Sequence, residues 1–428
     1  MKKVLIITYY WPPAGGPGVQ RWLKFVKYLR DYNIEPVVYI PENPTYPLKD
    51  ESLQAEVPEN LKVLKHRIFE PYAAAKFFSK KETQTISSGI IVKEENQSFL
   101  QKMMLYIRGN FFIPDARKFW IKPSVKYLEK SLEEEQISTI ITTGPPHSLH
   151  LIGLQLKKKK NMKWLADFRD PWTNIGYHEK LKLTKSSRQK HIAMEKEVLN
   201  AADHVLVTSF STKKEFEAKT TKPVSVITNG FDTEIASENI ELDQKFTFSH
   251  IGSLLSGRNP QNLWKALGEI IRENSGFAKD FELKLVGAVS EEVLNSIKAE
   301  GLEKQLKIQQ YVPHPEAIIF QRKSEVLLLI EIDSNETTGI IPGKVFEYMA
   351  AKRPILALGP AEWDVRKILE ETAAGQFFKY SEKEEIKGYL LQLYSDYKNG
   401  RLQVNSENTD RYHRRSLTEE LANLLKEL

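Results

Sequence analysis

Short apolar runs alternate with amphipathic stretches along the whole chain. Residues 4–9 are almost continuously apolar, as in a strand that is covered on both faces. In residues 20–31 apolar side chains recur at helical spacing with bases on the opposite face, and residues 36–40 predict a second strand. A strand, a helix and a strand in this order predict a parallel sheet with a right-handed crossover.

The alternation continues, stops near residue 230 and then starts again. Residues 232–245 are polar and acidic, which is typical of a linker. Helices are expected at 125–135 and 188–200, and the remaining expected strands are 61–68, 137–143, 164–168, 204–208 and 224–228 before the linker and 246–251, 283–286, 306–312, 326–331, 355–358 and 377–380 after it. This pattern predicts an α/β fold class with two Rossmann-like domains of similar size that face an interdomain cleft.

Composition and charge narrow the choice of function. The chain of 428 residues has 62 Lys and Arg against 56 Asp and Glu, a net charge of +6, and it contains no cysteine. Thiol catalysis, disulfides and thiolate metal sites are therefore excluded. No apolar run approaches the ~18 residues that cross a bilayer, and the N-terminus reads as a strand rather than a signal peptide. We expect a cytoplasmic protein.

Residues 45–120 fit the alternation poorly and read as an insertion. Within them, residues 97–120 interleave aromatic and basic side chains. One interpretation is an interfacial or acceptor-binding segment that faces anionic lipid headgroups. The other, which we favour from the sequence, is an ordinary core-packing insertion with a solvated basic face.

The first loop carries glycines between a strand and a helix. Gly15, Gly16 and Gly18 let the backbone approach an anion at the start of a helix. Arg21 stands where a dinucleotide-binding fingerprint needs its third glycine, and no P-loop lysine follows. The loop therefore predicts phosphate contact without a nicotinamide cofactor.

Two segments of the second half carry further candidate chemistry. Lys344 stands at the expected start of a helix that follows a Thr- and Gly-rich loop, and Glu347 lies one turn further on. Arg258 lies in the loop after residues 246–251, at the carboxyl end of a strand, where open α/β sheets bind ligands. The cations suit a diphosphate and the acid suits ribose hydroxyls. The alternatives are an ordinary crossover and a surface arginine.

Taken together, these segments resemble a known enzyme family. The glycine loop, Gly252-Ser253-Leu254, the Asn229-Gly230-Phe231-Asp232 turn and residues 343–354 (GKVFEYMAAKRP) are similar to nucleotide-sugar-dependent glycosyltransferases of GT-B architecture, in particular family 4 enzymes of bacterial polysaccharide and lipopolysaccharide biosynthesis. The resemblance implies an N-terminal acceptor-side domain over 1–230, a C-terminal donor domain over 231–410, and a helix over 411–428 that packs back on the first domain.

The resemblance also implies roles for individual residues. Arg258 and Lys344 match the basic pair that stabilises the leaving diphosphate, and Glu347 matches the acid that holds the ribose. The implied remaining donor contacts are Gly15, Gly16, Gly252, Val312, Thr338, Gly339 and Ile340. Gly339 stands where the family has its first motif acid, so Asp333, Glu336 or the loop amides would have to serve the sugar instead.

Two further segments of the first half are candidates for catalysis. His147 follows an expected strand, at a place where family members often put a histidine against the donor sugar; otherwise it is a loop histidine in a proline turn. Asp170, in Asp167-Phe168-Arg169-Asp170, also follows a strand. An acid there can orient or deprotonate an acceptor hydroxyl, while the competing interpretation is an internal Asp–Arg pair that fixes the loop.

The expected activity is transfer of a sugar from a nucleotide-diphosphate sugar to a glycan or lipid-linked acceptor. The resemblance implies a retaining reaction, and the cations make a metal unnecessary; no cofactor besides the donor substrate is expected. A peripheral position on an anionic membrane fits the positive charge. The rivals are a sugar-nucleotide epimerase of the same architecture and a basic nucleic-acid- or membrane-binding protein, although the chain shows no nucleic-acid motif.

Overall fold

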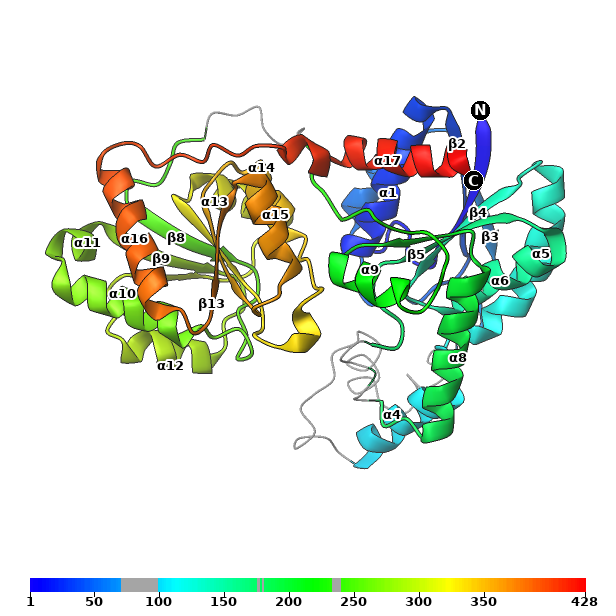
Figure 1. The fold of residues 1–428 in the computed structure, drawn as a ribbon, viewed down its shortest axis with the longest axis horizontal. Coiled ribbons are helices and arrows are strands. Elements are labelled where there is room, and N and C mark those ends of the chain that lie inside the picture. The colour runs from blue at the N-terminus through cyan, green and yellow to red at the C-terminus, as the bar shows by residue number, and fades with distance from the viewer. Residues whose placement is uncertain (71–98, 175–177, 179–180, 233–239) are drawn as a thin grey trace. The chain divides into compact units, whose positions relative to one another are not determined.

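The computed structural model describes residues 1–70, 99–174, 178, 181–232 and 240–428. The chain divides into two compact units (Figure 1). The N-terminal unit comprises Met1–Asn229 together with Arg414–Leu428, and the C-terminal unit comprises Gly230–His413. The sequence placed these divisions at 230/231 and 410/411.

The N-terminal unit is built on a seven-stranded sheet in the order β3-β2-β1-β4-β5-β6-β7, and all its strand pairs are parallel. Both faces of its central strands are covered, so β1 and β4 are buried along most of their length. The strands are β1 (Lys2–Ile7), β2 (Ile34–Pro41), β3 (Lys62–His66), β4 (Thr139–Gly144), β5 (Lys163–Phe168), β6 (His204–Val207) and β7 (Val224–Val226).

The helices of this unit follow from amphipathic segments between the strands. Pro17 at the first position of α1 supplies a backbone angle that suits a helix start, and Trp22 and Val26 of that helix are fully buried. The helices are α1 (Pro17–Leu29), α4 (Phe99–Phe111), α5 (Lys118–Glu134), α6 (Ser148–Lys160), α8 (Lys185–Ala201), α9 (Phe210–Glu217) and α17 (Arg414–Glu427).

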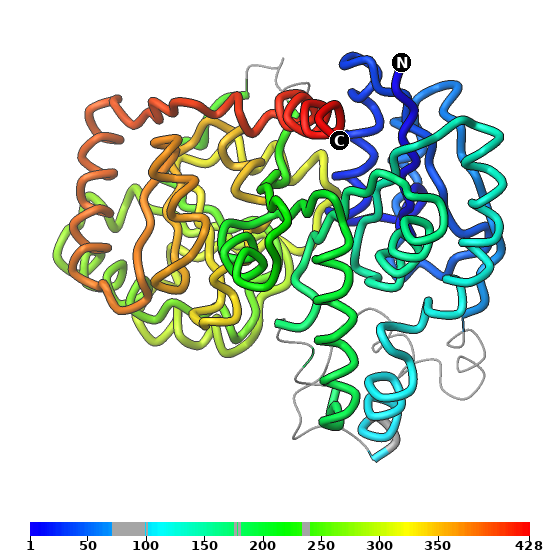
Figure 2. Tube along the Cα trace, turned by 45° about the vertical axis from the view of Figure 1, so that its right-hand side comes forward, coloured from blue at the N-terminus to red at the C-terminus, as the bar shows by residue number. Residues whose placement is uncertain are grey.

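The C-terminal helix α17 belongs to the N-terminal unit, where it lies beside α1 (Figures 1 and 2). Leu421 and Leu425 are fully buried in the same apolar cluster as Trp22. Arg415 pairs with Asp31 at 2.8 Å at the edge of this contact. The last residues of the chain therefore complete the core of the first unit.

The C-terminal unit repeats the architecture with a six-stranded parallel sheet in the order β10-β9-β8-β11-β12-β13. The strands are β8 (Phe246–Ile251), β9 (Phe281–Val286), β10 (Leu306–Gln309), β11 (Val326–Ile330), β12 (Ile355–Gly359) and β13 (Gly375–Lys379). The helices are α10 (Gln261–Glu273), α11 (Ser275–Asp280), α12 (Glu291–Ala299), α13 (His314–Lys323), α14 (Lys344–Ala350), α15 (Asp364–Thr372) and α16 (Lys383–Lys398).

The expected fold class is confirmed, since two parallel sheets are each covered by helices. Every expected strand overlaps an observed one, with ends that differ by a few residues. The irregular region 45–120 contains β3 and α4, while its residues 71–98 lie outside the described residues. Within the described part of the chain, no helix is both long enough and apolar enough to cross a membrane.

Each unit has a histidine buried in its core. His150 of α6 shares a hydrogen bond of 2.8 Å with Thr142 Oγ1 and stacks on Phe168, with ring centroids 4.2 Å apart. His250 of β8 lies 3.0 Å from the carbonyl oxygen of Leu328. Burial lowers the pKa of both imidazoles to about 3, and in His250 the charge of Lys344 adds to the effect.

These histidines predict acid lability. Between pH 6.5 and about 3 the unfolded chain binds protons that the folded imidazoles do not, so stability falls as the pH falls. Each histidine contributes a slope of up to about 1.4 kcal/mol per pH unit. Calorimetric unfolding across this range should show the loss. His150→Gln should reduce the slope by the share of one histidine, because the pKa values of His147 and His178 in the same unit are lowered as well. Equal slopes for the variant and the wild type would contradict the assignment.

Candidate functional site

The carboxyl ends of β8 and β11 and the start of α14 bring three charged side chains together in the C-terminal unit. Arg258 lies in the loop after β8, Glu331 directly follows β11, and Lys344 is the first residue of α14. In parallel sheets the carboxyl ends of neighbouring strands meet at one edge, and β8 and β11 are neighbours. The sheet order therefore explains why residues so distant in sequence meet.

Arg258 is held by a buried carboxylate. Its Nε and Nη2 donate hydrogen bonds of 3.1 and 2.9 Å to Oε1 of Glu331, which also accepts one from the backbone N–H of Ile332 at 2.8 Å. The side chain of Glu331 is 2% exposed and that of Arg258 31% exposed. The guanidinium is thus fixed in direction while part of it still faces solvent.

Lys344 lies against Gly252. A β-carbon at Gly252 would be 2.4 Å from Lys344 Nζ, and the φ of +119° at Gly252 also favours glycine. Burial, and after it the nearby charge of Arg258, lowers the pKa of Lys344 to about 8. The structure therefore brings together the two cations that the sequence singled out.

Glu347, one turn into α14, is held by two side chains of α13. Its Oε1 lies 3.1 Å from His314 Nε2, and its Oε2 accepts a hydrogen bond of 2.8 Å from Gln321 Nε2. The carboxylate is partly exposed, at 32%. A partly exposed carboxylate can accept hydrogen bonds from hydroxyl groups that reach it from the solvent.

The loop before α14 is fixed by hydrogen bonds from residues 363 and 364. The carbonyl oxygen of Thr338 accepts from the N–H of Asp364 at 2.9 Å, and that of Ile340 accepts from Trp363 Nε1 at 2.6 Å. Gly339 is half-buried between them, and Ile340 is exposed. The two acids considered in place of the missing motif acid, Asp333 and Glu336, are both exposed.

Val312, expected to flank the nucleotide base, follows β10 and is 8% exposed. The preceding Tyr311 is 83% exposed. An aromatic ring of this kind can stack on a base, so the more accessible stacking partner in this segment is Tyr311 rather than Val312.

In the N-terminal unit the glycine loop is pinned by the segment after β2. The N–H of Gly15 donates to the carbonyl oxygen of Leu48 at 3.1 Å, so this amide is already satisfied. Gly16 is the N-cap of α1 with a φ of +104°, and a β-carbon there would meet nothing within 4 Å. The loop is therefore open at Gly16, and Gly15 supports its shape.

Arg169, which directly follows β5, covers the first turn of α1. A β-carbon at Gly18 would lie 1.4 Å from Arg169 Nη1, so a side chain there would displace this guanidinium. Arg169 also donates to the carbonyl oxygen of Pro145 and has its guanidinium carbon 5.9 Å from the ring centroid of Tyr10. The sequence analysis did not name Arg169 as a candidate site residue. Its position at the carboxyl end of a strand could have indicated it.

His147 lies at the carboxyl end of β4 but is only 3% exposed. Its ring stacks on Trp172 with an interplanar angle of 3° and a centroid distance of 4.9 Å. Both ring nitrogens lack a hydrogen-bond partner among the described residues. Desolvation lowers the pKa of His147 well below its ordinary value, so the imidazole is neutral at neutral pH.

Asp167 and Asp170 have different environments. Asp167 is fully buried and accepts hydrogen bonds from Arg21 Nη2 at 3.1 Å, Trp22 Nε1 at 2.7 Å and Thr143 Oγ1 at 2.8 Å. Its arginine partner thus comes from α1 and not from the neighbouring Arg169. Asp170 has an exposed surface, while desolvation by the surrounding protein raises the pKa of its carboxyl.

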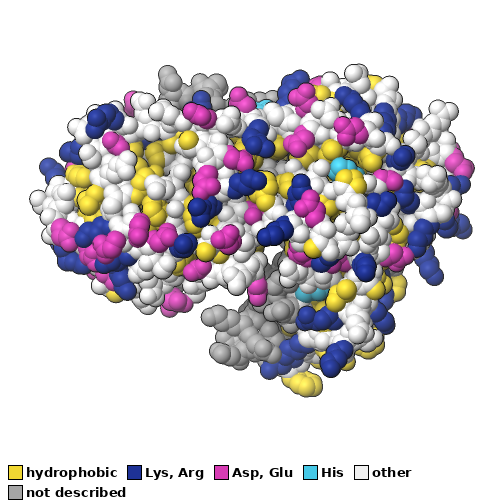
Figure 3. Space-filling model, viewed as in Figure 1, with side chains coloured by type: hydrophobic (Ala, Val, Ile, Leu, Met, Phe, Trp, Pro, Cys, Tyr) yellow, Lys and Arg dark blue, Asp and Glu magenta, His cyan; other side chains and the backbone are white. Residues whose placement is uncertain are grey.

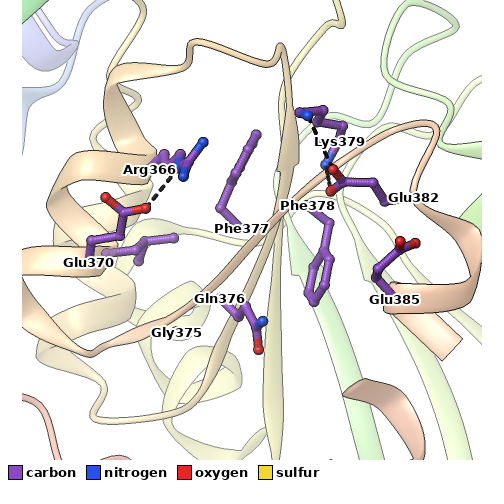
Figure 4. Close-up of a pocket in the computed structure, with 10 residues that line it drawn as sticks. Arg366, Glu370, Gly375, Gln376, Phe377, Phe378, Lys379, Glu382 and Glu385 are labelled. Carbon is purple, nitrogen blue, oxygen red and sulfur yellow. Dashed lines mark hydrogen bonds and ion pairs between the residues drawn. The ribbon is translucent and has the colours of Figure 1, made fainter. Parts of the chain in front are cut away.

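No group of three or more potential metal ligands occurs among the residues described. A cavity of about 530 Å³ lies along the edge strand β13, between α15 and the start of α16 (Figure 4). Four of its charged residues pair with one another, Arg366 with Glu370 at 2.7 Å and Lys379 with Glu382 at 3.3 Å, and Glu385 also lines it. It contains none of the candidate residues and carries no argument for the site.

Comparisons with known proteins establish the fold. No protein-family model matches the chain, and no curated protein sequence matches it. Among solved structures it is similar to Anabaena HepE in complex with UDP, at 14% identity and a TM-score of 0.61, over 100% of both chains. The lipopolysaccharide outer core galactosyltransferase WaaB matches at 13% identity and 0.58, again over 100% of both.

A putative UDP-N-acetylglucosamine 2-epimerase from Listeria monocytogenes matches at 13% identity with a TM-score of 0.53, over 100% of this chain and 96% of its own. Since all these identities are low, the likeness concerns architecture. The chain has the GT-B fold, as the sequence resemblance implied.

The two aspartates predict a sharp contrast in stability. Asp167→Asn leaves the buried Arg21 without its counter-charge and should lower the unfolding free energy by about 3 kcal/mol. Asp170→Asn is the matched control and should change it by less than about 0.5 kcal/mol. Urea unfolding of both variants tests this, and comparable losses would refute the division of roles.

Proposed function

We propose that the protein is a glycosyltransferase that uses a nucleotide-diphosphate sugar as donor. The observation that carries the proposal is the pair of cations Arg258 and Lys344 at one edge of the C-terminal sheet, with Glu331 as the buried carboxylate that fixes Arg258. Two cations held at one sheet edge are suited to the negative charges of a diphosphate. The fold shared with HepE, whose structure contains UDP, supports the same class of ligand.

In the proposed mechanism the sugar–phosphate bond breaks and negative charge develops on the diphosphate. Arg258 and Lys344 stabilise that charge electrostatically, which is where fixed cations contribute most to rate. Glu347 accepts hydrogen bonds from the ribose, and Tyr311 stacks on the base. No metal is needed if the two cations suffice.

The acceptor side is proposed to lie on the N-terminal unit. Asp170 is exposed there and can orient or deprotonate an acceptor hydroxyl. A glycan or lipid-linked acceptor in cell-surface polysaccharide synthesis is supported by the shared fold of WaaB. Three expectations stay predictions: retention of configuration, a place for His147 against the donor sugar, and the approach of the Gly16 loop to the diphosphate.

The epimerase alternative has an observation of its own, since the fold also matches a putative epimerase. An epimerase releases no nucleoside diphosphate in proportion to a glycosylated acceptor. Acceptor-dependent release of nucleoside diphosphate from the donor sugar would favour the transferase, and conversion of the sugar nucleotide without any acceptor would favour the epimerase.

Ligand binding provides the first test. A nucleoside diphosphate at about 100 times its Kd should stabilise the protein by about 2.7 kcal/mol, which thermal unfolding detects. Lys344→Met should weaken this binding at least tenfold without lowering the stability of the free protein, because the lost charge was costly to bury. Glu347→Gln should weaken the binding of a nucleoside diphosphate, which has a ribose. It should leave the binding of inorganic pyrophosphate, which has none, unchanged.

Lys265→Met is the control for these variants, because Lys265 is an exposed lysine on α10 of the same unit. It should bind like the wild type. Wild-type affinity in Lys344→Met, or a lack of any shift with nucleoside diphosphates and their sugars, would remove the basis of the proposal.

The pKa of Lys344 predicts how binding depends on pH. Below about pH 8 Lys344 of the ligand-free protein is charged and can bind an anion directly. Above about pH 8 it is neutral and has to take up a proton when the anion binds, so affinity should fall as the pH rises through about 8. The phosphates do not contribute, since their last pKa is about 6. Calorimetric titration should show a decline of up to about tenfold per pH unit, absent in Lys344→Met. A flat profile in the wild type would contradict it.

A further inference from the structure

Helix α4 exposes an apolar stripe to solvent. Phe99, Met103, Tyr106, Ile107 and Phe111 are 84%, 43%, 43%, 39% and 62% exposed. Their spacing of four, seven, eight and twelve residues from Phe99 puts them on one side of the helix. Ordinary core packing, which the sequence favoured for this segment, does not account for five large side chains on the solvent side.

The opposite side of α4 is fixed to the N-terminal unit. Leu105 is buried, and a β-carbon at Gly109 would be 2.6 Å from the carbonyl oxygen of Leu181. At the C-terminal end of the helix, on the same side as the stripe, Asn110 donates to the carbonyl oxygen of Lys182 at 3.2 Å and accepts from the N–H of Thr184 at 2.8 Å, just before α8. Both views of the backbone show α4 beside this end of α8 (Figures 1 and 2). The stripe therefore has a fixed direction.

Exposed aromatic rings continue the surface beyond the end of α4. Lys118 donates to the carbonyl oxygen of Phe111 at 2.6 Å and lies 5.3 Å from the ring centroid of Phe119. Phe119 is 43% exposed and packs edge-on against Phe69, which is 65% exposed. The apolar surface thus extends across the contact between α4 and α5.

The surroundings of the stripe are basic. The residues of α4, of the segment 181–184 and of α8 up to residue 191 include no Asp or Glu. They include six basic residues, namely Lys102, Arg108, Lys182, Lys185, Arg188 and Lys190. Figure 3 shows hydrophobic side chains bordered by Lys and Arg over this part of the molecule, at the bottom of the view.

We propose that α4 and the first turns of α8 form a membrane-docking surface that binds the face of an anionic lipid bilayer. The apolar stripe enters the boundary between headgroups and acyl chains, and the bases contact the lipid phosphates. With 13 residues, α4 is about 20 Å long and lies in the membrane plane rather than across it. This proposal does not depend on the proposed enzyme activity.

Charge and chemistry favour a bilayer over other occupants. A second copy of the chain bound through the same surface would place two all-basic rims against each other. Nucleic acid would use the aromatic rings for stacking but offers nothing apolar to Met103 and Ile107. Anionic lipid satisfies both the apolar stripe and its basic border.

Vesicle binding of the full-length protein tests the proposal. Flotation with phosphatidylcholine vesicles, with and without phosphatidylglycerol, should recover the protein at least tenfold better with the anionic lipid at low salt, and added salt should weaken the binding. The triple variant Met103→Gln/Ile107→Gln/Phe111→Gln should lose this binding. Lys102→Glu/Lys185→Glu/Arg188→Glu should lose it as well.

Matched controls use exposed residues of the C-terminal unit. Leu391→Gln/Ile308→Gln removes apolar side chains that are 39% and 52% exposed, and Lys265→Glu/Lys298→Glu/Lys304→Glu makes the same change in net charge. These variants should float like the wild type. All variants should keep the thermal shift of the wild type with nucleoside diphosphates, which separates this test from that of the enzyme activity.

Three results would overturn the proposal. Equal recovery with neutral and anionic vesicles would exclude an anionic surface as the partner. Equal loss in the control variants would show that net charge or general surface hydrophobicity is responsible. Concentration-dependent dimers that disappear in the α4 glutamine variant would assign the stripe to a second copy of the chain.

Discussion

The C-terminal site depends on holding two positive charges close together in a half-buried place. Arg258 and Lys344 repel each other, and the depressed pKa of Lys344 reports that repulsion together with desolvation. Glu331 reduces the cost, because its buried carboxylate pairs with Arg258 at 2.9 Å. The charges of Glu347 and Glu331 also act on Lys344 and oppose the lowering of its pKa. A site that is arranged before its ligand arrives needs no reorganisation when the charge develops.

In the N-terminal unit a buried carboxylate holds neighbouring elements of the core together. Asp167 ties together β4, β5 and α1 through Thr143, Arg21 and Trp22, all of them buried. A buried pair of this kind contributes little net stability, but losing one partner is costly. Its structural effect is to fix the start of α1, where Gly16 and Arg169 lie. The position of the loops at the carboxyl edge of this sheet thus depends on hydrogen bonds inside the core.

The two features of the molecule that face outward are separate in origin. The site residues lie at carboxyl ends of strands, a place determined by the parallel topology. Helix α4 belongs to an irregular segment inserted between β3 and α5, so its outer side does not have to pack against the sheet. That freedom permits an apolar stripe with a basic border, which a crossover helix covering the sheet has no room to present.

The sequence by itself determined the α/β class, all the strands and the identity of the two cations, because apolar periodicity and turn residues act locally and are visible in any short window. It also marked Glu347 and the glycine loop. It did not reveal Glu331, although an acid directly after a five-residue apolar strand was a signal, nor the pairing of Asp167 with Arg21, which are 146 residues apart. Only the tertiary structure decided these, and with them the burial of His147 and the exposed side of α4. Partners, burial and pKa values depend on which segments the strand order brings side by side, and that order is not encoded in any single segment.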